Sequence, residues 1–511
     1  MAKQLIAASI AAPAFYGLNT QESGVTLQEG YALHADNCII DKYGRLGSRK
    51  GWTTLTVGST GVNLLGLSNF KEITGADTLL SWNATSFFKG STSLTTLTPT
   101  TTDTIAAGNW QTATLNDHHF FYQRGYVPLI YTNETTTDEF VSYASHTHAT
   151  AGYQSANTVL AAYGRLWTAD TTTNKTTVWF SDVLDGAKFS TGTSGSLDIS
   201  SVLTRGMDEI VALGAHNGNL IIFCKNNIII YSDGDNFQTG MTTANLTLVE
   251  VIEGVGCIAR DSVQNTGEDI LFLSNTGVRS LNRTVQEKSA PMRDISKNIR
   301  DDIIEALNAE VLADVKSVYS PTNAFYLLTF PATQQTFCFD TRSPMKDGSF
   351  RVTIWPLLTP KGLLSLDSEL YFAQPNGVAK YRLYSDDGVK YAMSYYSNYF
   401  DLGLPNVNKI VKKITATTVG ASGQTFALKV GYEYSPIYFS STFILTEGTV
   451  HEYGVAEYNI AEYAGAVLIN DQSSPTQGAG NIIQIGFTTD INGTAMSLQK
   501  ISIFAKQGKV L

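Results

Sequence analysis

Two clusters of histidine are the clearest candidates for metal chemistry in this sequence. His118 and His119 are adjacent, and one residue separates His146 from His148. Side chains two residues apart on a β-strand lie on the same face, so two imidazoles could share a metal ion. A stable site needs a third protein ligand, and the neighbouring sequence supplies none. We therefore interpret both clusters as polar contacts at the surface or between subunits, and expect no metal.

Motifs of the common enzyme classes are missing. The sequence contains no Walker A motif, no G-x-S-x-G and no H-E-x-x-H. Four aromatic residues could line a sugar-binding face, but they lie within alternating strands, which favours packing in the core. They are Tyr163, Trp167, Trp179 and Tyr231. We expect no catalytic residues and no cofactor.

Composition narrows the class of protein. The 511 residues carry 35 basic and 45 acidic side chains, a net charge of −10 that disfavours binding of nucleic acid through a basic surface. The length exceeds that of a single hydrophobic core, so two or more packed units are expected. No apolar run is long enough to span a bilayer, and the opening residues are a poor match to a signal peptide. The four cysteines are too scattered to indicate a disulfide framework.

A repeated β-hairpin is the element that would position any site. In one clear copy, residues 219–224 and 228–231 form two β-rich runs around a short turn that contains Asn. Similar hairpins begin near residues 78, 117, 164, 219, 269, 323 and 369. Their spacing of roughly 50 residues is the period of propeller repeats, in which neighbouring blades bury each other's faces. The pattern predicts an all-β fold with a β-propeller of about seven blades; an irregular large β-sandwich is the alternative.

The regions around the repeats predict the domain organisation. Residues 391–511 contain longer alternating strands, typical of an antiparallel sandwich or platform domain. Residues 1–65 lack the hairpin pattern, so we expect them to join that domain and leave 66–390 for the propeller. Within the propeller, residues 294–308 predict a helical insertion with Ser296 or Asp294 as N-cap. Its apolar residues recur every fourth position, at Ile295, Ile299, Ile303 and Leu307.

The segment from Gly30 to Trp52 carries a family resemblance. Its pattern is an Asn, an apolar pair, a turn that ends in Gly-Arg-Leu, and then Arg-x-Gly-aromatic. The residues are Asn37, Gly44, Arg45, Arg49, Gly51 and Trp52. In this pattern the segment resembles the opening of short-tailed bacteriophage tail proteins, known as nozzle, tail tubular protein B and packaged-DNA stabilisation proteins. Residues 254–257 with the hairpin that follows, and residues 400–409, are similar to further parts of that family.

The resemblance implies a structural virion protein with no enzymatic activity. Six copies of such proteins form a tube below the head–tail connector, which retains the packaged genome and conducts DNA during ejection. The implied partners are further copies in a hexamer, the connector or adaptor ring, tail fibres or other tail proteins, and double-stranded DNA that passes without sequence-specific binding. The implied location is the tail of the virion, after synthesis in the host cytoplasm. An acidic channel would repel phosphates and let DNA slide.

Two other functions stay open from the sequence. A carbohydrate-binding or carbohydrate-cleaving propeller would need two or three carboxylates that face one axial pocket if it cleaves its ligand. A protein-binding scaffold is the third possibility, although the Trp-Asp blade endings of WD40 repeats are missing. Within the phage interpretation, we expect Arg45, Arg49 and Lys50 to serve in turns and interface salt bridges rather than in DNA contacts.

Overall fold

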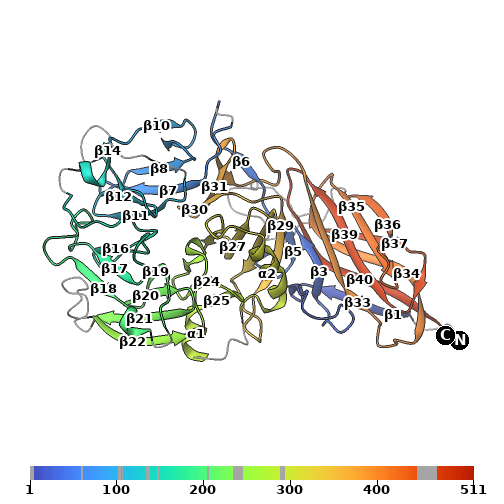
Figure 1. Cartoon of the computed structure of the whole chain (residues 1–511). Coiled ribbons are helices and arrows are strands. Elements are labelled where there is room, and N and C mark those ends of the chain that lie inside the picture. Colours follow the sequence, from blue (N-terminus) through green and yellow to red (C-terminus); the bar gives the residue numbers. More distant parts are fainter. Residues whose placement is uncertain are drawn as a thin grey trace.

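The computed structural model describes residues 5–58, 61–101, 105, 108–133, 139–146, 149–203, 206–233, 246–287, 294–445 and 469–510. These residues fold almost entirely into β-structure, in two parts that lie side by side (Figure 1). A ring of small sheets forms the propeller, and two sheets with longer strands form what we call the platform. None of the described helices is long and apolar enough to cross a membrane.

Four antiparallel sheets follow one another along the chain in the propeller, each with its strands in sequence order. The first contains β7 (Gly66–Lys71), β8 (Asp77–Trp82), β9 (Phe87–Lys89) and β10 (Thr95–Leu97). The second contains β11 (Gln111–Leu115), β12 (His118–Tyr122), β13 (Leu129–Thr132) and β14 (Glu139–Ser142). The third contains β15 (Thr158–Ala162), β16 (Arg165–Ala169), β17 (Thr177–Phe180) and β18 (Gly195–Asp198). The fourth contains β19 (Ile210–His216), β20 (Asn219–Cys224), β21 (Asn227–Asp233) and β22 (Leu246–Glu253).

Two further small sheets belong to the ring, and β26 (Lys316–Ser320) contacts a strand of each. One has three strands, β23 (Gln264–Asn265), β24 (Ile270–Ser274) and β25 (Gly277–Ser280), preceded by the 3-10 turn η3 (Arg260–Ser262). The other contains β30 (Gly362–Leu366), β31 (Glu369–Gln374), β32 (Gly377–Tyr381) and β6 (Trp52–Thr54). Strand β6 comes from the N-terminal segment and pairs with β32, while β30 packs against β7. A strand from a distant part of the sequence therefore completes the last blade. The innermost strand of that blade, β30, contacts β7, the innermost strand of the first blade.

The predicted hairpins are all present, as the second and third strands of their sheets. The blade count, however, is six rather than about seven. The hairpin predicted near residue 323 lies in the run β26 (Lys316–Ser320), β27 (Phe325–Phe330), β28 (Gln335–Asp340) and β29 (Arg351–Pro356). Strand β29 pairs with β3 (Tyr31–Asp36) of the N-terminal segment, so these strands continue into a ten-stranded sheet instead of ending as a separate blade.

Both ends of the chain build the platform. Its ten-stranded sheet continues from β3 through β33 (Tyr391–Phe400), β39 (Ile483–Ile491), β35 (Thr425–Tyr432) and β36 (Tyr438–Ile444), with β2 (Gly17–Leu18) beside β3. The seven-stranded sheet contains β1 (Leu5–Ala11), β4 (Cys38–Ile40), β5 (Leu46–Ser48), β34 (Val407–Gly420), β37 (Ile469–Pro475), β38 (Ala479–Gly480) and β40 (Met496–Val510). Alternating residues of these strands fill one apolar core, in which the rings of Phe426 and Phe487 stack at 5.1 Å. The N-terminal segment thus joins the platform, except for β6.

Helices are few and short. The predicted helix at 294–308 begins later, as the turn η4 (Lys297–Ile299) and then α2 (Arg300–Asn308). Its expected capping residues are used elsewhere: the Ser296 hydroxyl accepts a 2.9 Å hydrogen bond from the Val278 N–H, and the Asp294 carboxylate pairs with Arg279. Ile295, Ile299 and Ile303 are buried in the platform core, as their spacing predicted. The helix α1 (Leu281–Glu287) was not predicted, and η1 (Tyr143–Ser145) and η2 (Ser200–Val202) are single turns.

Candidate functional site

The motif residue Arg49 lies where the chain passes from the platform to the propeller. Residues 49–51 connect β5 to β6, and residues 382–390 return from β32 to β33. The Arg49 guanidinium forms two hydrogen bonds to the Asp386 carboxylate, at 2.8 and 2.7 Å, and only 1% of its side chain is exposed. This two-point geometry fixes orientation as well as charge. The pair therefore fastens together the two connections between the parts.

Asn37 and Tyr391 hold the same guanidinium from the platform side. The Arg49 Nε donates to Asn37 Oδ1 at 2.7 Å, and the guanidinium carbon lies 4.0 Å from the Tyr391 ring centroid. Asn37 has a φ of 54°, in the left-handed region that Asn tolerates better than most residues. In this conformation its Nδ2 donates to the Ala392 carbonyl at 2.7 Å. Burial raises the pKa of Tyr391, so its hydroxyl stays protonated and donates to the Arg49 carbonyl.

Gly51 and Trp52 continue this junction. The Gly51 N–H donates to the Leu383 carbonyl at 2.9 Å, and the Trp52 N–H donates to the Ser385 carbonyl at 3.1 Å. A Cβ atom on Gly51 would lie 1.9 Å from the Ser385 oxygen, so only glycine allows the two connections to run this close. Trp52 is half-buried against the propeller core beside the platform.

The other two motif residues lie apart from the junction, at the turn between β4 and β5. Gly44 has a φ of 72°, and a Cβ there would lie 2.6 Å from the Cβ of Pro13. Arg45 stacks over the Tyr43 ring and donates to the Gln499 side chain. The side chains of Arg45 and Arg49 are both buried, so within the single chain neither presents a surface to DNA.

The histidines that the structure describes do not converge on a metal site. His119 is fully enclosed between the hydroxyls of Thr114, 2.7 Å from Nδ1, and Ser68, 3.0 Å from Nε2. Burial lowers the pKa of His119 to about 3, so this imidazole is neutral. His118 packs edge-on against His146, with ring centroids 5.2 Å apart, while His148 lies outside the described residues. No group of three histidine, cysteine or acidic side chains in the described part of the chain could hold a metal ion.

The aromatic residues considered for a sugar-binding face belong to the cores of the blades. Trp167 and Tyr231 are buried in one apolar cluster, which Tyr163 covers, and Trp179 packs against another. All four cysteines are unpaired and buried. In such surroundings a free thiol packs as a small apolar group.

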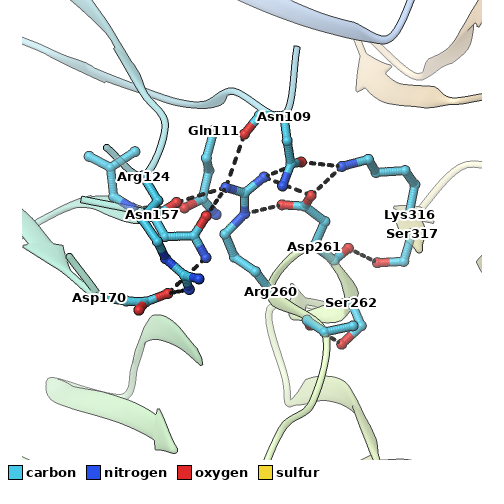
Figure 2. A network of polar contacts seen from close by, with 12 residues as sticks. Asn109, Gln111, Arg124, Asn157, Asp170, Arg260, Asp261, Ser262, Lys316 and Ser317 are labelled. Atoms are coloured by element: carbon cyan, nitrogen blue, oxygen red, sulfur yellow. Dashed lines mark hydrogen bonds and ion pairs between the residues drawn. The ribbon is translucent and has the colours of Figure 1, made fainter. Parts of the chain in front are cut away.

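A buried polar network lies where the innermost strands of the propeller begin (Figure 2). Its centre is Arg260 in η3, whose three nitrogens all donate. Nη1 bonds the carbonyl of Asn157 at 2.7 Å and that of Asn109 at 3.2 Å, while Nε and Nη2 bond Asp261 at 2.7 and 2.8 Å. Asn109 precedes β11 and Asn157 precedes β15. One guanidinium therefore connects three sheets of the ring.

Lys316, the first residue of β26, extends the network to a fourth unit. Its ammonium donates to Asp261 and, at 2.9 Å, to the side-chain oxygen of Asn109. Burial alone would raise the pKa of Asp261, but Arg260 and Lys316 outweigh that effect and hold it well below its usual range. Burial lowers the pKa of Lys316, which Asp261 only partly offsets. The shared carboxylate is firmly ionised, and it is the counter-charge of two cations, Arg260 and Lys316.

Asp170 is a second carboxylate that pairs with two cations. Asp170 accepts from Asn157 at 2.9 Å and from Lys175 at 2.7 Å, and it also pairs with Arg124. The connected network thus holds two carboxylates and four cations. It is a locally positive centre in a chain whose net charge is −10.

A pocket of about 250 Å³ lies beside Arg260 and Lys316 at this end of the propeller. Its lining includes Trp110, Gln111, Lys316 and Lys361, which lie at or next to the starts of β11, β26 and β30, and Trp82 at the end of β8. Asp261 is the single carboxylate in the lining, and it is already paired with two cations. Glycoside hydrolysis uses two carboxyl groups, so this pocket does not have the machinery expected for the carbohydrate-cleaving alternative.

Comparison with known proteins identifies no family for this chain. No known family profile and no curated protein matches the sequence. Among solved structures, the chain is similar to PorZ, a surface component of the type-IX secretion system of Porphyromonas gingivalis, with 12% identity and a TM-score of 0.34, over 64% of this chain and 37% of PorZ. It is similar to BamB from Moraxella catarrhalis, with 9% identity and a TM-score of 0.32, over 74% of this chain and 97% of BamB. It is also similar to the β-propeller domain of Cps50 (Swd1) from Myceliophteria thermophila, with 9% identity and a TM-score of 0.37, over 67% of this chain and 98% of that domain.

Proposed function

We propose that this chain is a structural subunit of a short phage tail, a nozzle protein that assembles as a hexameric ring below the head–tail connector. In this role it extends the channel, retains the packaged genome and conducts double-stranded DNA during ejection without catalysis. The observation that carries the proposal is the junction at Arg49. Four of the six residues of the phage-like pattern, Asn37, Arg49, Gly51 and Trp52, lie there and join propeller to platform, as a subunit of a stiff tube requires.

The edge of the platform offers a surface for contact between copies. Strand β36 ends the ten-stranded sheet, and among the described strands it pairs only with β35. Ile437, Phe439 and Ile444 are 75%, 48% and 67% exposed along this edge. A long open edge with exposed apolar side chains is a template for pairing with another chain. We assign this edge to the contact between neighbouring subunits.

The charge of the chain supports passage of DNA rather than its capture. The net charge of −10 disfavours adhesion to phosphates, and Arg45 and Arg49 are occupied inside the subunit. The expected partners are therefore the connector or adaptor ring, tail fibres or other tail proteins, and DNA in transit.

Assembly of the purified full-length chain tests the proposal. Size-exclusion chromatography with light scattering should give rings of several copies, alone or after addition of a purified phage connector. Phe439→Glu should disrupt these rings, because it places a charge on the contact edge. The control is Ile73→Glu, which changes a more exposed apolar residue on the propeller (82% exposed) and should leave the rings intact. A chain that stays monomeric with and without the connector would contradict the proposal.

A further inference from the structure

We propose that the axial pocket of the propeller binds a small organic anion, a ligand of monosaccharide size that carries one carboxylate or phosphate group. This binding is independent of the nozzle assignment, because it involves neither the junction nor the platform edge. The volume of about 250 Å³ falls just below the range typical of drug-sized ligands and suits a compact molecule.

The charge around the pocket selects for an anion. Arg260 and Lys316 share the single carboxylate of Asp261, and Lys361 adds a third cation to the lining. Asp314, exposed nearby, contributes a weak attraction to Lys316. Burying an excess of positive charge is costly unless a counter-charge is supplied. An anion in the pocket would supply it.

The hydrogen-bonding groups of the pocket point to the same ligand class. Lys316 uses two of its three N–H groups, on Asn109 and Asp261. Gln111 accepts from the Val159 N–H at 2.7 Å through its oxygen, so its amide N–H groups remain to be used. The exposed Lys361 ammonium has no acceptor among the described residues. The spare groups are donors, and carboxylate and phosphate oxygens are acceptors.

The pocket is also held in shape before any ligand arrives. Arg260 bonds the backbone in front of β11 and β15, and Asp261 accepts from Lys316 at the start of β26. The Trp82 indole N–H donates to the Gly108 carbonyl at 3.0 Å, which fixes one wall. A site whose groups are already placed loses little entropy on binding. The network of Figure 2 therefore serves as the floor of a binding site as well as a brace for the ring.

Isothermal titration calorimetry on the full-length chain tests the inference, with glucuronate, glucose 6-phosphate and neutral glucose as probes. We expect at least one of the two anions to bind at least about tenfold more tightly than glucose, and the tighter of the two identifies carboxylate or phosphate as the preferred group. Lys361→Gln should weaken that binding about tenfold, and so should Lys316→Gln if the variant folds. Lys225→Gln, which changes an exposed lysine on the turn between β20 and β21, should leave it unchanged.

Three results would overturn the inference. One is the absence of binding by both anionic probes at millimolar concentration. Another is equal binding of glucose, and the third is an affinity for the anion that Lys361→Gln does not alter. Because Lys361 is exposed, loss of binding in that variant is not explained by misfolding, and its thermal midpoint in the absence of ligand provides the check. None of these results depends on whether the chain forms rings.

Discussion

The Arg49 guanidinium and the Asp386 carboxylate, 337 residues apart in the sequence, meet in two parallel hydrogen bonds of 2.8 and 2.7 Å. Arg49 lies on the connection that enters the propeller and Asp386 on the one that leaves it. Their contact therefore joins the two chain connections that run between propeller and platform.

Asp386→Ala should destabilise the protein strongly. The substitution leaves a nearly fully buried guanidinium without its counter-charge, and breaking such a pair costs about 3–5 kcal/mol. Urea denaturation followed by tryptophan fluorescence measures the change. Asp490→Ala is the matched control, since Asp490 pairs with Lys390 on the surface, with side chains 50% and 62% exposed. It should cost less than about 1 kcal/mol, and equal effects of the two substitutions would argue against the role of Arg49 at the junction.

Gly51→Ala should separate the two connections. The added Cβ would lie 1.9 Å from the Ser385 oxygen, a backbone atom that cannot turn away. Gly58→Ala provides a reference, because Gly58 has a φ of 75° but nothing within 4 Å of an added Cβ. Its cost is the backbone strain alone, about 1–2 kcal/mol. A fall in the thermal midpoint no larger for Gly51→Ala than for Gly58→Ala would show that the close approach is not maintained in solution.

Acid should weaken the propeller through Asp261. Its pKa in the folded protein lies below the unfolded value of about 3.9. The ion pairs with Arg260 and Lys316 therefore contribute fully above about pH 4, and the contribution is lost as the pH falls below it toward the depressed folded pKa. Asp261→Asn should be less stable than the unsubstituted protein at neutral pH and should approach it in acid. A constant difference between the two across pH 2–7 would contradict this assignment.

His119 should make the stability of the folded protein depend on pH in a range above that of Asp261. Burial lowers its pKa to about 3, while the unfolded value is about 6.5. Between these values the unfolded chain binds the proton and the folded chain does not, so stability falls as the pH is lowered through this window, by at most about 1.4 kcal/mol per pH unit. His119→Gln should flatten this part of the curve whatever its absolute stability. An unchanged slope would mean that His119 is protonated in the folded state.

The central hairpins could be predicted because their strands are apolar on both faces. In β20 and β27 nearly every residue is buried, whereas the outer strands β10 and β18 contain no fully buried residue. The sequence pattern therefore predicted the second and third strands of each blade but not the outermost strands. The error in blade number came from β29, because nothing in its sequence distinguishes pairing with β3 from a free outer edge.

The buried polar contacts could not be predicted from the spacing of residues in the sequence. Arg260, Asn109 and Lys316 meet because closure of the ring brings the starts of its innermost strands to one axis. Their separations along the chain follow no local period. The Arg260-Asp261 pair, set directly behind the buried Ala259, was the one available signal, since adjacent charges entering a core need partners. Arg49 was identified by its pattern, but its partner Asp386 was not.

Single-particle electron microscopy of the purified full-length chain, with and without a phage connector ring, tests the central claim most directly. We expect rings of sixfold symmetry in which each copy keeps propeller and platform in one fixed orientation, with β36 at the contact between neighbours. Isolated copies under both conditions, or rings that leave the β36 edge exposed to solvent, would contradict it.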